Sequence, residues 1–176
     1  MQEAKVHPEK ILVVEDNMSM LLLVQKAIFK VLPNAEVSSA VSLEEAFAIL
    51  IKNSDIHDKK PYDLVIADIF LEGNGTGLDF WRVICGTYPQ IPFLIISSLA
   101  EDKVMSNVLE HEKKNLIYFR KPFLMPELQA KIKEVLSPRD NTAGAQSGLR
   151  RQEHDETIVG SDEQIEHLAH MLILKL

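Results

Sequence analysis

Five short apolar runs alternate along the first three quarters of the chain with segments in which apolar residues recur at helical spacing. The runs are rich in Val, Ile, Leu and Phe and are bounded by polar or turn residues, which is typical of strands buried on both faces. We place these strands at residues 10–14, 36–40, 63–68, 92–96 and 116–119, and the helices at residues 21–31, 43–50, 77–86, 102–114 and 126–135. Such alternation predicts an α/β domain with a parallel sheet covered by helices on both faces.

Capping residues mark where several of these helices begin. Asn17 precedes the first helix, and Ser42 followed by Glu45 has the form of a capping box. Ser98 before Glu101 is a second box of this form, and Pro126 is expected at the first position of the last helix. The helix over 102–114 has few apolar anchors, so we expect it to be held weakly.

Composition divides the chain into four parts. Residues 1–9 are polar, residues 10–136 form the α/β domain, and residues 137–160 read as a flexible linker because they almost lack large apolar side chains. Residues 161–176 predict a tail helix with an apolar face formed by Ile165, Leu168, Ala169, Leu172 and Ile173. A lone helix of this length is marginal in water. We therefore expect it to dock on the domain, on a second copy or on a partner.

Charge and hydropathy exclude several classes of function. The net charge of −7 leaves no basic surplus for direct binding of nucleic acid. No apolar run is long enough to span a membrane, and the N-terminus lacks a signal-peptide core, so we expect a cytoplasmic protein. The single cysteine, Cys85, excludes an internal disulfide and is expected to be buried filler. The six histidines show no metal-ligand spacing.

Ionisable and hydroxyl groups stand where the predicted strands end. Glu15 and Asp16 follow the first strand, Asp68 ends the third, Ser97 follows the fourth and Lys121 follows the fifth. A parallel sheet brings these positions to one edge, where ligands bind. Clustered carboxylates favour Mg²⁺, a lysine can pair with a phosphate oxygen, and an aspartate can be a nucleophile for phosphoryl transfer. The pattern indicates phosphoryl chemistry at Asp68.

Four motifs in this order resemble the receiver domain of bacterial two-component response regulators. They are ILVVEDN at residues 11–17, VIADI at residues 65–69, IISS at residues 95–98 and YFRKPF at residues 118–123. The resemblance covers about residues 10–136 and is closest to single receivers of the chemotaxis type. It implies a flavodoxin-like, doubly wound sheet of five parallel strands in the order 2-1-3-4-5.

The resemblance also implies how the acidic residues act. Asp68 would be the phosphoacceptor, charged by a histidine kinase or a phosphotransfer protein. Asp16 and Asp68 would bind Mg²⁺ directly, with the main-chain carbonyl of Phe70 as the third protein ligand. Glu15 would act through a coordinated water. The protein would then be a phosphoacceptor that assists its own phosphorylation rather than an enzyme.

The resemblance also implies which residues contact the phosphoryl group and which respond to it. Ser97 and Lys121 would contact its oxygens, and Tyr118 matches an aromatic switch residue that turns inward. The output surface would span residues 102–135 and bind a downstream protein target. A homodimer through this surface or through the tail helix is a further expected partner.

The chain departs from the family pattern around Asp68. The following loop is one residue longer than the commonest form, Glu72 replaces a usual proline, and Ser98 stands where alanine is common. Phe70 and Leu99 occupy the positions that flank the acyl phosphate in this family. Both are apolar and cannot orient an attacking water, so we expect a long-lived phosphorylated state.

Two other functional interpretations of the sequence remain at this point. Residues 157–161, followed by the tail helix, resemble the entry to the ATPase module of sigma-54-dependent activators, so the chain could be a receiver fragment or remnant of such an activator. Its phosphate-binding loop is not in the sequence. The second reading is a haloacid-dehalogenase phosphatase, but that class requires an aspartate where this chain has Phe70.

Overall fold

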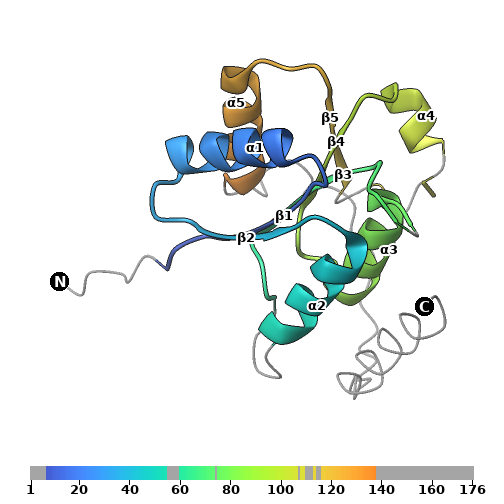
Figure 1. The fold of residues 1–176 in the computed structure, drawn as a ribbon, viewed down its shortest axis with the longest axis horizontal. Coiled ribbons are helices and arrows are strands. Elements are labelled where there is room, and N and C mark those ends of the chain that lie inside the picture. The colour runs from blue at the N-terminus through green and yellow to red at the C-terminus, as the bar shows by residue number, and fades with distance from the viewer. Residues whose placement is uncertain are drawn as a thin grey trace, which may run out of the picture.

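A five-stranded parallel sheet forms the centre of the molecule (Figure 1). The computed structural model describes residues 7–54, 60–73, 75–106, 108–109, 113 and 116–137. The strand order is β2-β1-β3-β4-β5, as the resemblance to receiver domains implies. The strands are β1 (Lys10–Val14), β2 (Glu36–Ala40), β3 (Leu64–Asp68), β4 (Phe93–Ser97) and β5 (Leu116–Arg120).

Helices cover both faces of this sheet and complete the doubly wound α/β fold. The helices are α1 (Met18–Val31), α2 (Leu43–Asn53), α3 (Gly77–Thr87), α4 (Glu101–Met105) and α5 (Met125–Leu136). α1 and α5 pack together on one face, and α2 and α3 lie on the other (Figure 1). Alternate residues of each central strand therefore enter two separate cores: Ile11 lies under α1 and α5, whereas Leu12 lies on the side of α2 and α3.

The capping signals are confirmed where the side chain can reach the first turn. Asn17 accepts a hydrogen bond from Met20 N–H at 3.0 Å, and Ser42 accepts one from Glu45 N–H at 3.2 Å. The reciprocal bond differs from the prediction, because the Glu45 carboxylate accepts from Val41 N–H at 2.8 Å instead of from Ser42 N–H.

The prediction for α4 is wrong at its start. Its N-cap is Ala100, which makes no side-chain capping bond, and Ser98 lies too far upstream to cap it. The described helix covers only Glu101–Met105 of the expected 102–114, anchored by Val104 as its one buried residue. Little apolar surface holds this element, which agrees with the expected weak packing.

Two smaller expectations also need correction. Pro126 occupies the second rather than the first position of α5, because the helix begins at Met125. Cys85 of α3 is only partly buried, and it packs at the margin of the core.

The predicted linker, the tail helix and most of the N-terminal segment lie outside the described residues. Within the described part of the chain, no helix has the length and apolar character that a membrane crossing requires.

Candidate functional site

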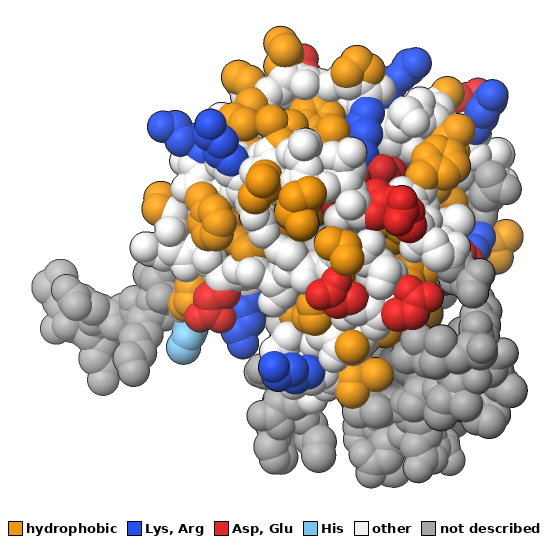
Figure 2. Space-filling model, viewed as in Figure 1, with side chains coloured by type: hydrophobic (Ala, Val, Ile, Leu, Met, Phe, Trp, Pro, Cys, Tyr) orange, Lys and Arg blue, Asp and Glu red, His pale blue; other side chains and the backbone are white. Residues whose placement is uncertain are grey.

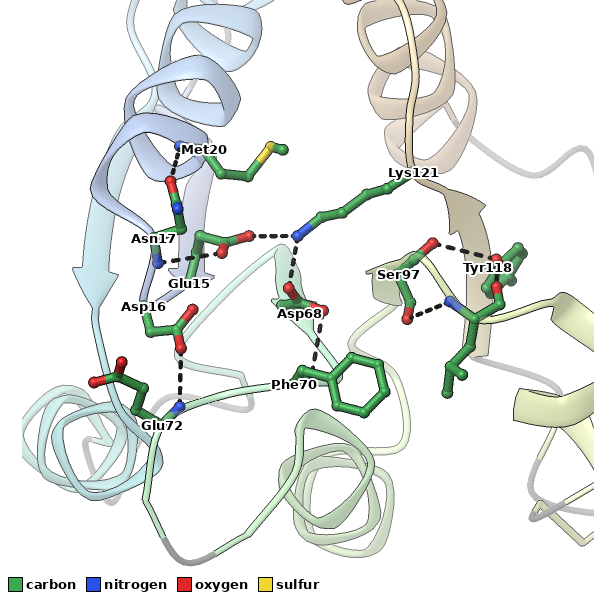
Figure 3. A network of polar contacts seen from close by, with 11 residues as sticks. Glu15, Asp16, Asn17, Met20, Asp68, Phe70, Glu72, Ser97, Tyr118 and Lys121 are labelled. Carbon is green, nitrogen blue, oxygen red and sulfur yellow. Dashed lines mark hydrogen bonds and ion pairs between the residues drawn. The ribbon is translucent and has the colours of Figure 1, made fainter.

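The carboxyl ends of the strands bring three charged groups into direct contact (Figure 3). Lys121, one residue after β5, reaches across β4 and places its Nζ 2.6 Å from Asp68 Oδ2 and 3.0 Å from Glu15 Oε2. The backbone fixes its starting point, because Lys121 N–H donates to the Ser97 carbonyl at 2.7 Å. The peptide bond from Lys121 to Pro122 is cis. The structure thus joins residues 53 and 106 positions apart in sequence.

These three side chains are largely withdrawn from solvent. The exposed fractions are 16% for Lys121, 11% for Asp68 and 5% for Glu15. Burial by itself would lower the pKa of Lys121, but hydrogen bonds to Asp68 and Glu15 raise it above its ordinary value. Burial raises the pKa of Glu15, and Lys121 offsets only part of that effect. The ammonium group therefore stays charged and lies between two carboxylates.

Asp16 lines the same cavity without joining the ion pairs. The cavity has a volume of about 490 Å³, and the residues that line it are Glu15, Asp16, Asn17, Ser19, Met20, Leu23, Asp68 and Lys121. Asp16 Oδ2 accepts a hydrogen bond from Glu72 N–H at 3.0 Å, which ties the loop after β3 to the end of β1. Its Oδ1 makes no hydrogen bond within the described part of the chain.

Asp68 is held by its own loop as well as by Lys121. Its Oδ1 accepts from Phe70 N–H at 3.2 Å, while the Phe70 side chain is 53% exposed beside the carboxylate (Figure 3). Phe70 also forms an antiparallel bridge with Thr76, which closes the loop. Each oxygen of Asp68 thus accepts one hydrogen bond from the protein.

Ser97 and Tyr118 lie on the other side of Asp68 from Asp16 (Figure 3). Ser97 is fully buried, and its Oγ accepts from Leu99 N–H at 3.2 Å. The Tyr118 hydroxyl contacts the carbonyl oxygens of Leu99 and Ser97. Neither side chain hydrogen-bonds Asp68 or Lys121 directly, so Ser97 is at the predicted edge but is turned toward the loop after β4.

The carboxylates that line this cavity could hold Mg²⁺ with few protein ligands. No group of three carboxylate, imidazole or thiolate side chains among the described residues is arranged to hold a metal together. Mg²⁺ usually takes only one or two protein carboxylates and keeps several waters. Asp16 and Asp68 line the same cavity and match that requirement; Asp16 Oδ1 makes no hydrogen bond with any described residue. Glu15 is engaged with Lys121, which fits an indirect role.

Sequence reasoning placed the start of α3 at Gly77 but missed why a glycine is needed there. A Cβ at this position would lie 2.0 Å from the Asp68 carbonyl oxygen and 2.9 Å from its carbonyl carbon, so only glycine lets α3 start against the end of β3. Thr76 and Asp79 form a full capping box at the same point. The signal was present, because Thr76-Gly-Leu-Asp79 has the spacing of a capping box.

Comparison with solved structures identifies the same fold in other proteins. A response regulator receiver protein from Sinorhizobium medicae is 22% identical, with a TM-score of 0.63 over 77% of this chain and 100% of that one. The chemotaxis response regulator CheY4 of Vibrio cholerae is 20% identical, with a TM-score of 0.59 over 74% of this chain and 100% of its own.

A third structure is the phosphorylated cyanobacterial phytochrome response regulator RcpA. It is 23% identical, with a TM-score of 0.57 over 73% of this chain and 91% of that one. No curated protein matches the sequence significantly. The family model of the response regulator receiver domain matches residues 11–133, which is well over half of the 176 residues. The chain therefore belongs to the response regulator receiver domain family.

Proposed function

We propose that this protein is a phosphoryl-accepting switch in which Asp68 is the phosphoacceptor. The phosphodonor is a phosphohistidine on a histidine kinase or a phosphotransfer protein. The observation that carries the proposal is the position of Lys121 Nζ, 2.6 Å from Asp68 Oδ2 and 3.0 Å from Glu15 Oε2 at the carboxyl edge of the sheet. A structural salt bridge alone does not require a second carboxylate or an adjoining cavity.

Asp68, Lys121 and Ser97 have different roles in the transfer. An Asp68 oxygen attacks phosphorus; the bond from phosphorus to the donor imidazole breaks, and its electron pair stays on that nitrogen. Such transfers depend on positioning and charge neutralisation. Lys121 pairs with the incoming phosphoryl oxygens as it pairs now with Asp68. The buried hydroxyl of Ser97 turns toward the same group.

A bound Mg²⁺ would neutralise charge on the phosphoryl oxygens. Asp16, Asp68 and the Phe70 carbonyl would hold it, and Glu15 would act through a water. Asp16 supports this assignment because its Oδ1 accepts no hydrogen bond from the residues that the structure describes.

The readout follows from the hydrogen bonds of Ser97. Its Oγ now accepts from Leu99 N–H, and Tyr118 contacts the carbonyls of both residues. Drawing Ser97 toward a phosphoryl group weakens these bonds, so the loop after β4 moves and Tyr118 turns inward. The surface of α4, β5 and α5 then binds a downstream protein target or a second copy. We place this switch in the cytoplasm and assign it no enzymatic turnover of its own.

A phosphorylation assay in solution tests the assignment. The protein is incubated with acetyl phosphate and Mg²⁺, and intact mass and size are measured. We expect one added phosphoryl group in the wild type and none in Asp68→Asn. Asp63→Asn is the matched control, because Asp63 stands at the opposite end of β3 and pairs with Lys60. Phosphorylation of Asp68→Asn at the wild-type level contradicts the proposal, and a larger particle identifies dimerisation as the output.

The lifetime of the phosphorylated state is a separate test. Phe70 is apolar and stands beside the carboxylate, so it cannot position a hydrolytic water. We expect loss of the phosphoryl label to take far longer than seconds, and Phe70→Asn to shorten it. Decay of the wild type within seconds refutes this expectation but leaves the phosphoacceptor assignment intact. The sigma-54 alternative gains no support, because residues 157–176 lie outside the described residues.

A further inference from the structure

Helix α1 carries an apolar stripe that the domain itself leaves uncovered. Met18, Leu22 and Phe29 are 57%, 57% and 45% exposed, although the opposite side of α1 is buried in the core. We call these three residues the α1 stripe. They are spaced by four and seven residues, so they share one side of the helix over about 16 Å.

The stripe faces the open edge of the sheet. Gln25 lies between Leu22 and Phe29, and its Nε2 donates to Ser39 Oγ of the edge strand β2 at 2.6 Å. Figure 2 shows apolar side chains gathered on the face that carries α1 and β2. This surface is distinct from the α4, β5 and α5 surface.

We propose that the tail segment, residues 161–176, docks on the α1 stripe. The tail segment has matching apolar periodicity, with Ile165, Leu168 and Leu172 at helical spacing over a similar length. Residues 138–160, as an unstructured coil of 23 residues, would span about 25 Å. That span is sufficient, because the preceding helix α5 already packs against α1.

Charge sets the direction of docking. The only charged residues of α1 are Lys26 and Lys30, both exposed in its second half. The tail segment carries its acids, Asp162, Glu163 and Glu166, at its start. An antiparallel arrangement places these acids beside the two lysines and the apolar end of the tail segment beside Met18.

The size of the stripe favours a tethered segment over a free partner. Specific complexes between separate proteins bury roughly 1,200–2,000 Å² in total, far more than three side chains provide. A tethered segment competes at an effective concentration in the millimolar range, so a small interface is enough. The proposal does not depend on phosphorylation of Asp68.

Methionine methyl NMR with a spin label tests the docking in the full chain. The label is attached to Lys175→Cys in a Cys85→Ala background. We expect loss of most of the Met18 methyl intensity, no loss at Met105 on α4, and no dependence on protein concentration. Broadening of Met105 instead of Met18, or no broadening of either, overturns the proposal. Broadening that needs a mixture of labelled and unlabelled chains overturns it in favour of a second copy.

Variants separate the apolar and charged parts of the interface. Leu168→Asp with Leu172→Asp, and independently Leu22→Asp, should restore the Met18 signal. Lys26→Glu with Lys30→Glu should restore it partly, whereas Lys52→Glu on the exposed surface of α2 is the matched control and should leave it broadened. Persistent broadening in the Leu22→Asp protein contradicts docking on the stripe.

Discussion

Helices α1 and α4 flank the site at the same edge of the sheet, but they are built very differently. α1 has 14 residues, a capping bond from Asn17 and four buried side chains. α4 has five described residues, no side-chain capping bond and Val104 as its only buried residue. Helical stability in proteins comes mainly from packing of the apolar face, so α4 can be displaced at a much smaller cost in free energy.

This difference matches how each side is connected to Asp68. On the α1 side, Lys121 joins Asp68 to Glu15 through short ion pairs that are largely buried. On the α4 side, hydrogen bonds among Ser97, Leu99 and Tyr118 connect the strand ends to the loop that leads into α4. Buried ion pairs therefore hold the charged groups on the α1 side, whereas hydrogen bonds around a loop make the connection on the α4 side.

Truncating the buried face of each helix should give the largest contrast. Ile28 on α1 is completely buried, so Ile28→Ala should lower the free energy of unfolding by about 2–5 kcal/mol. Val104→Ala on α4 should cost about 1–2 kcal/mol, since fewer methyl groups leave and the short helix can relax. Urea unfolding measures both. Equal losses would show that α4 is as firmly integrated as α1.

Hydrogen exchange should separate the helices without mutation. Amides of α1 around Val24 and Ile28 should exchange only through global unfolding, whereas Val104 N–H and Ser106 N–H should exchange through local opening of α4. We expect a difference in protection on the order of 100-fold or more. Mass spectrometry of peptides from the two helices gives the measurement. Comparable protection would remove the physical basis for treating α4 as the mobile side.

Changing the N-cap residues should alter the stability of α1 and α4 by less than truncating their buried side chains does. Asn17→Ala removes the bond to Met20 N–H and should destabilise α1 by about 1 kcal/mol. Ala100→Ser supplies the side-chain cap that α4 lacks and should increase protection of its amides by a few-fold. Urea unfolding and hydrogen exchange check the two variants. No change in α4 after Ala100→Ser would mean that packing alone limits this helix.

The same contrast explains what the sequence could predict. The buried strands and α1 were predictable from apolar periodicity, because packing holds these elements together. The strand order came from the resemblance to receiver domains. α4 was predicted with a wrong cap and a different extent, since five residues with one apolar anchor carry little periodic signal. Ser98 had the correct spacing to Glu101, but α4 begins only at Glu101, with Ala100 as its N-cap.

The sequence predicted which charged side chains meet at this edge of the sheet, but not most of their contacts. Strand ends placed Glu15, Asp68 and Lys121 at one edge, and the structure brings them within hydrogen-bonding distance. The bond from Glu72 N–H to Asp16 and the close approach of Gly77 to Asp68 depend on the path of a loop. No periodicity encodes such a path, so these contacts required coordinates.

Tyr118 provides the smallest and most specific test of the α4 side. Partial burial raises its pKa; Arg120 opposes this effect, while Glu101 and Asp102 at the start of α4 add to it. Because the folded-state pKa lies above the unfolded value, this contribution to stability is full below the unfolded pKa. It is lost as the pH rises through the folded pKa. Unfolding free energy should therefore fall with pH in the alkaline range, and less steeply in Tyr118→Phe.

The two acids allow this pKa to be connected to the position of α4. Glu101→Gln should lower the pKa of Tyr118 in an ultraviolet titration of the phenol, whereas Glu44→Gln in the first turn of α2 is a matched control and should not. The effect of Glu101→Gln requires α4 to stay close to β5. If the titration is the same in Glu101→Gln and wild type, α4 spends most of its time away from Tyr118, and the contrast with α1 is larger than the structure shows.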